Sequence, residues 1–82
     1  MATARQAKGD VDEAIKDYNQ AIQLQPDYAN AYLNRGLVYY NKKDLVGAIK
    51  DYNEVIRLQP ENANAYLNRG LAYHSNDDLV SA

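Results

Sequence analysis

Cysteine is absent from this chain of 82 residues, and the other residues on which reactive sites depend are scarce. Without a thiol, the chain has no disulfide framework, no thiolate nucleophile and no Cys-ligated zinc. The single histidine, His74, has no second histidine with which to build a metal cluster or a catalytic triad. We therefore expect a protein that is not an enzyme, with no catalytic residues, no metal and no cofactor.

Long apolar runs and an excess of one charge are also missing. No run approaches the roughly 20 apolar residues needed to cross a bilayer, and residues 1–13 lack the apolar segment of a secretory signal. Nine basic and eleven acidic residues give a net charge of −2, without the basic face that nucleic acids require. We expect a cytoplasmic protein whose partner is neither a nucleic acid nor a membrane.

What the sequence does contain is a repeat with a period of 34 residues. When residues 14–48 are aligned with 48–82, 24 of the 35 positions are identical. A period of this length is typical of stacked arrays, in which no single unit can bury its apolar face alone. The repeat therefore predicts a single domain, 1–82, made of a partial repeat (1–28), a complete repeat (29–62) and a truncated repeat (63–82).

Each period has the pattern of two helices. Tyr32, Gly36 and Tyr39 share one helical stripe, and Asp27 precedes it as an expected N-cap, which predicts a helix over about 28–42. Asp44 is the expected N-cap of a second amphipathic helix, which should end before Pro60. One helix before Pro26, preceded by a remnant of another, and one over about 62–76 complete the expected set.

Lys43 and its repeat-mate Asp77 stand where the first helix of each repeat should turn into the second. A left-handed backbone is expected at both positions, with some strain because neither residue is glycine.

These residues resemble the tetratricopeptide repeat, a helix–turn–helix unit of 34 residues with the pattern W-x2-L-G-x2-Y…A-x3-F…P. The matching positions are Tyr32, Arg35, Gly36, Tyr39, Ala48, Tyr52 and Pro60, then Tyr66, Arg69, Gly70, Tyr73 and Ala82, and upstream Ala14, Tyr18, Ala21 and Pro26. The resemblance implies an all-α fold in which antiparallel helix–turn–helix repeats stack as a right-handed α-solenoid. It also implies a scaffold for protein–protein interaction.

The pattern also predicts which residues pack and which face water. Gly36 and Gly70 should let helices approach closely, so that Gly36→Val would overpack the contact. Arg35 and Arg69 stand where the family prefers Leu, and we expect their stems to cover apolar surface with the charged heads in water. A solvated face of mixed charge is expected for Glu13, Asp17, Asp51 and Glu54, which alternate with Lys16, Lys50 and Arg57.

In this family the first helices of successive repeats line a concave groove. Carried onto this chain, the peptide groove consists of Asn30, Leu33, Asn34, Leu37, Tyr40 and Asn41, together with Asn64, Leu67, Asn68, Leu71, His74 and Ser75. Asn side chains both donate and accept hydrogen bonds, so they suit the backbone of an extended peptide. The alternative is a merely solvated polar face. The charged clamp with which some members hold a C-terminal carboxylate is absent, because its Lys and Arg fall on Asn64 and Asn68.

A second function class stays open beside the peptide groove. The two ends of the chain are complementary, because one lacks a first helix and the other lacks most of a second helix. The expected self-association ends are Ala14, Tyr18 and Ala21 on one side and Tyr66, Gly70 and Tyr73 on the other. The chain would then be a self-associating module, a natural fragment or an engineered one, that forms a homo-oligomer, ring or filament.

Overall fold

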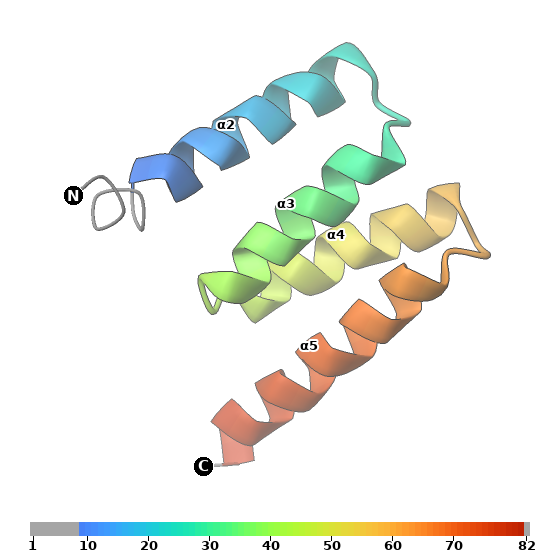
Figure 1. The fold of residues 1–82 in the computed structure, drawn as a ribbon. Coiled ribbons are helices and arrows are strands. Elements are labelled where there is room, and N and C mark those ends of the chain that lie inside the picture. Colours follow the sequence, from blue (N-terminus) through green and yellow to red (C-terminus); the bar gives the residue numbers. More distant parts are fainter. Residues whose placement is uncertain (1–8, 82) are drawn as a thin grey trace.

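The computed structural model describes residues 9–81, with side chains over residues 11–76. This part of the chain forms four helices, α2 (Gly9–Leu24), α3 (Ala29–Asn41), α4 (Leu45–Leu58) and α5 (Ala63–Ser81), and contains no strand. Consecutive helices run antiparallel and pack as pairs, while α3 also contacts α5 (Figure 1). The fold is thus all-α, with stacked helix–turn–helix units, as the repeat predicted. The remnant helix expected at the N-terminus lies outside the described residues.

The core is arranged around α4, which lies between α3 and α5. Tyr52 and Val55 of α4 are the largest fully buried side chains. Val55 packs with Ala29 and Ala65, and one turn earlier Tyr52 packs with Ala48 and Ala72. Ala29 of α3 and Ala65 and Ala72 of α5 are small, so one bulky residue per turn of α4 fills the space between the flanking helices, because interiors are packed to crystal-like density. Residues 29–76 therefore contain the best-packed part of the structure.

The turns explain where α3, α4 and α5 begin. Asp44 accepts a hydrogen bond from the Gly47 amide at 3.0 Å and caps α4 as predicted. The prediction for Asp27 is wrong, because the N-cap of α3 is Tyr28 and no side chain caps it. At the equivalent place before α5, Asn62 accepts a hydrogen bond from the Ala65 amide at 3.1 Å. The cap position of α3 is therefore one residue later than predicted, and Asn62 is the residue at the equivalent position before α5.

The turn predicted near Asp77 is also absent. Lys43 has the expected left-handed backbone, with φ of 73°, and it directs the chain from α3 into α4. At its repeat-mate the helix continues, so α5 runs to Ser81 instead of ending near Asn76. A left-handed non-glycine residue costs energy. Within the described chain no second helix packs beyond residue 76 to offset that cost.

Candidate interaction surfaces

The first half of the predicted groove lies along α3, where some of its residues are exposed and others pack against the core. Asn30, Asn34, Asn41 and Leu37 are exposed. Leu33 and Tyr40 are half-buried, and both pack against the buried cluster around Tyr52. On this helix, then, the amides and Leu37 are available to a ligand, whereas Leu33 and Tyr40 also stabilise the fold.

The second half lies along α5 and is more open. Leu67 and Leu71 are 62% and 48% exposed, Asn64 and His74 are exposed, and Asn68 and Ser75 are half-buried. The hydroxyls of Tyr40 and Ser75 lie 3.1 Å apart in a hydrogen bond, so the structure brings the C-terminal ends of the two stripes together. The two helices that carry the stripes run in the same direction and are in contact (Figure 1).

The asparagines of these stripes are unpaired. Among the described residues, the side-chain amides of Asn30, Asn34, Asn64 and Asn68 have no hydrogen-bond partner, whereas Asn19 and Asn53 each have one and Asn62 has two. An unpaired amide at a half-exposed surface offers two donor hydrogens and an acceptor oxygen. The stripe thus presents polar groups that the fold itself does not use.

A second surface, across the repeats, is organised by Arg35. Its guanidinium donates to both carboxylate oxygens of Asp51 on α4, at 2.8 and 2.7 Å, and to the side-chain oxygen of Asn19 on α2, at 2.6 Å. The carbon at the centre of the guanidinium also lies 5.5 and 5.8 Å from the ring centres of Tyr32 and Tyr39, within the range of a cation–π contact. One arginine therefore connects three helices.

This network corrects two expectations drawn from the sequence. Asp51 is buried, at 4% exposure, instead of lying on a solvated face, and the head of Arg35 is paired instead of lying in water. Arginine binds a carboxylate through two parallel hydrogen bonds, so the pair tolerates burial. The repeated combination of Arg at 35 and 69 with Asp at 17 and 51 was the signal that could have revealed it.

Arg69, the repeat-mate of Arg35, has only part of this network. It donates to Asn53 at 2.7 Å, just as Arg35 donates to Asn19, and it lies 5.4 and 5.9 Å from the ring centres of Tyr66 and Tyr73. No carboxylate pairs with it among the described side chains. The arginine is thus held in place, while no other described side chain accepts a hydrogen bond from its guanidinium.

Gly36 on α3 and its repeat-mate Gly70 on α5 also differ, because only Gly36 has a neighbouring helix packed against it. A Cβ atom added to Gly36 would lie 2.7 Å from Cε1 of Tyr52, closer than side chains approach. A Cβ added to Gly70 would meet nothing within 4 Å. Gly36 is therefore required by a close helix contact, whereas the equivalent face of α5 is uncovered in the described structure.

Two ionisable groups in this region have a raised pKa, each for a different reason. Burial raises the pKa of Tyr52 to about 12, helped by the neighbouring Tyr40 and Asp51. The hydrogen bond to Asp51 raises the pKa of Arg35 above its ordinary value. Both shifts favour the states that the contact requires, a neutral tyrosine and a charged arginine.

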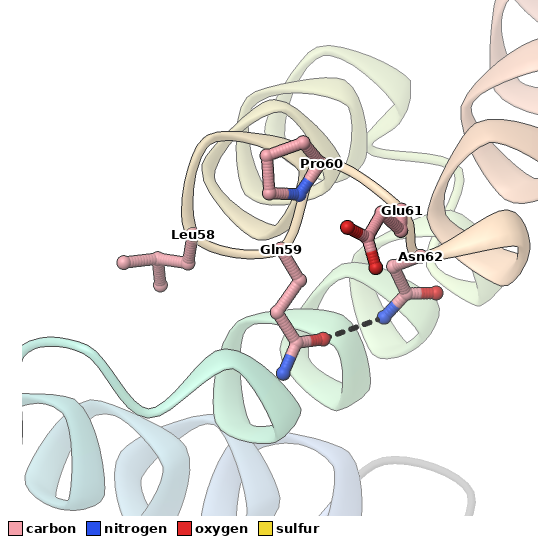
Figure 2. A pocket seen from close by; sticks show the side chains of 5 residues that line it. All are labelled: Leu58, Gln59, Pro60, Glu61 and Asn62. Carbon is pink, nitrogen blue, oxygen red and sulfur yellow. Dashed lines mark hydrogen bonds between the residues drawn. The ribbon is translucent and has the colours of Figure 1, made fainter.

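A hollow open to solvent lies at the turn between α4 and α5, away from both predicted surfaces. It is lined by Leu58, Gln59, Pro60, Glu61 and Asn62 (Figure 2). The amide of Asn62 donates to the side-chain oxygen of Gln59 at 2.9 Å across it. None of the twelve predicted groove residues lines this hollow, and its polar groups come from a single turn. It offers no convergent set of groups for a reaction.

Comparison with known proteins identifies the repeat. The family model described as TPR repeat matches residues 4–43 and again residues 41–77, and no curated protein matches the sequence.

Among the described residues no group of three acidic or histidine side chains could hold a metal ion. In the same part of the chain, no helix has both the length and the apolar character of a membrane span.

Proposed function

Because the chain belongs to the tetratricopeptide-repeat family, whose repeats generally mediate protein–protein interaction, we propose that it binds an extended peptide along α3 and α5. The observation that carries this proposal is the row of unpaired asparagine amides beside exposed leucines. Asn34 and Asn68 are repeat-mates on neighbouring helices, so their amides can contact successive parts of one peptide backbone. An amide pairs with a backbone N–H and C=O irrespective of the peptide's sequence.

The apolar part of the surface supplies the remaining affinity. Leu37, Leu67 and Leu71 are each more than a third exposed, and burying such side chains against a ligand stabilises a complex by roughly 25 cal/mol per Å² of apolar area. The twelve groove residues include no Lys, Arg, Asp or Glu. The ligand that fits is therefore an extended segment with aliphatic side chains, rather than one recognised through a terminal carboxylate, which prefers charged donors.

A double substitution tests the groove. Peptides are selected on the unmodified chain from a random-peptide display library and then measured on Asn34→Ala with Asn68→Ala. Asn34 is exposed and Asn68 is half-buried, and neither amide has a partner among the described residues. Surface substitutions that break no contact of the fold usually change the free energy of unfolding by no more than about 0.5 kcal/mol, so the melting temperature should hardly change while binding weakens. The matched control is Gln20→Ala with Gln23→Ala, which removes two exposed amides from α2. Unchanged binding by the double variant, or loss of its fold, would contradict the proposal.

Self-association is the second candidate, and a different observation favours it. Gly36 on α3 packs against Tyr52 of α4, whereas no described residue packs against Gly70 on α5. Beside Gly70, Tyr66 and Tyr73 are 45% and 48% exposed. Exposed aromatic side chains around an uncovered glycine are typical of a helix face that lacks its packing partner. On this reading a further copy of the chain is the partner, and the oligomer is a homo-oligomer.

A further inference from the structure

The uncovered face of α5 has an equivalent face on α3, its twin, against which α4 packs. On α3 the twin consists of Tyr32, Arg35, Gly36 and Tyr39, and on α5 the corresponding residues are Tyr66, Arg69, Gly70 and Tyr73. These four residue types are identical and occupy the same helical positions. The difference is that α4 packs on the first set, whereas no described atom lies within 4 Å of a Cβ added at Gly70 and the two tyrosines beside it are 45% and 48% exposed. The structure of the α3–α4 contact therefore shows what kind of helix fits α5.

Two adjacent residues of α4 make that contact. Asp51 pairs with Arg35 through Nε and Nη2, and the ring of Tyr52 lies over Gly36. Helix α2 carries the same pair, Asp17 and Tyr18, within the sequence AIKDYN that α4 repeats at 48–53. Asp17 is exposed and has no ion pair with any side chain that the structure describes.

We propose that α2 of a second copy docks on α5 in the register that α4 adopts on α3. The carboxylate of Asp17 then pairs with Nε and Nη2 of Arg69, and the ring of Tyr18 covers Gly70. Arg69 is already oriented for this, because Asn53 and the two flanking tyrosines hold it as their equivalents hold Arg35. The inference rests on the second candidate function and gives it a partner, a surface and a register.

The contact joins two different surfaces of the chain and is therefore heterologous. A copy that uses its α5 still offers its α2 to the next copy, so association continues as a filament or closes as a ring. In this register Leu67 and His74 of the α5 stripe would lie near the docked helix, because their repeat-mates Leu33 and Tyr40 pack against the cluster around Tyr52. The three residues that test the register, Asp17, Arg69 and Gly70, nevertheless lie outside both groove stripes. Peptide binding and self-association can therefore be measured separately.

Charge reversal tests the register. In Asp17→Arg two arginines would meet at the contact, and in Arg69→Asp two aspartates would meet. Each variant alone should associate at least about tenfold more weakly than the unmodified chain, because like charges facing one another suppress binding. When the two variants are mixed, every contact regains one acid and one arginine. Sedimentation velocity should then show mixed oligomers close to the mass of the unmodified ones.

A second variant avoids any effect of Arg69 on folding. In Gly70→Leu the new Cβ meets no described atom within 4 Å in the monomer, but the leucine side chain would occupy the place of the Tyr18 ring. This variant should fold by circular dichroism and stay monomeric. The register is overturned if Asp17→Arg and Gly70→Leu associate like the unmodified chain, or if mixing restores nothing. A monomeric mass for the unmodified chain up to high concentration overturns self-association altogether. The groove is tested separately: it is overturned only if the Asn34, Asn68 double variant binds peptide unchanged or loses its fold.

Discussion

Arg35 and Asp51 form a paired contact in which each carboxylate oxygen accepts one hydrogen bond, at 2.8 and 2.7 Å, from a different nitrogen of the guanidinium. The side chain of Asp51 is 6% exposed and that of Arg35 is 19% exposed. Because the pair is largely shielded from water, its removal leaves a desolvated charge instead of a hydrated one. This distinguishes it from the pair between Lys42 and Asp12, whose atoms lie 3.6 Å apart on the surface.

The first prediction concerns Asp51 and its repeat-mate. Asp51→Ala should lower the free energy of unfolding by about 3 kcal/mol, since breaking a buried pair leaves the arginine without its partner. The matched control is Asp17→Ala, which removes the same side chain from an exposed position and should cost no more than about 0.5 kcal/mol. Chemical denaturation at low protein concentration, where copies do not associate, measures both. Equal losses for the two variants would contradict the burial argument.

The second prediction is that the same substitution has opposite effects at two glycines. Gly36→Ala forces the buried ring of Tyr52 to move and should destabilise the fold by about 1–3 kcal/mol, as overpacking does. Gly70→Ala meets no atom and should stabilise α5 by up to about 1 kcal/mol through helix propensity. Thermal melts of the two variants check this. Two shifts of the same sign would mean that the glycines share one role.

The third prediction concerns alkaline pH. The pKa of Tyr52 is about 12 in the folded chain and close to 10 when unfolded. Between these values the folded chain holds the proton that the unfolded chain loses, so stability is full below pH 10 and falls as pH rises towards 12. Tyr52→Phe keeps the ring and removes the titrating hydroxyl. Urea unfolding at pH 8 and 11 should show a smaller loss in this variant than in the unmodified chain; an equal loss would place the alkaline sensitivity elsewhere.

The fourth prediction compares the two acidic residues that precede helices. Asp44→Ala removes the cap bond to Gly47 and should cost about 1 kcal/mol. Asp27→Ala removes no cap, because Tyr28 occupies that position, and should be nearly neutral. Melting temperatures measured side by side distinguish the two. A clear loss for Asp27→Ala would restore the sequence-based assignment.

Local chemistry made much of the fold predictable. The 34-residue period placed four helices, Asp44 identified the start of α4, and Gly36 correctly predicted a close contact. Each of these features depends on neighbours along the chain or on an identical copy one period away. The groove residues stay a prediction, although the structure shows that Leu33 and Tyr40 also serve the core.

The features that the sequence did not predict depend on which face of a helix meets which neighbour. Asp17 and Asp51 stand in the same sequence, IKDYN, yet one is exposed and the other buried. A charge pattern within one helix cannot distinguish them, because burial comes from Arg35 on a different helix. For the same reason Asp77 resembles a turn residue, yet α5 continues through it to Ser81, and no helix follows α5 in the described chain.

The position of Arg35 between Asn19 and Asp51 also bears on how the chain unfolds. Of the described helices, α2 packs only on α3, so it should be the first to open. Arg35 bonds both Asn19 of α2 and Asp51 of α4. Local opening of either helix therefore frees the arginine and weakens its contact with the other helix. Amide hydrogen exchange in α2 and at the N-terminal half of α4 should therefore respond together to a change at residue 35. The cooperative unit extends across the boundary of the 34-residue period.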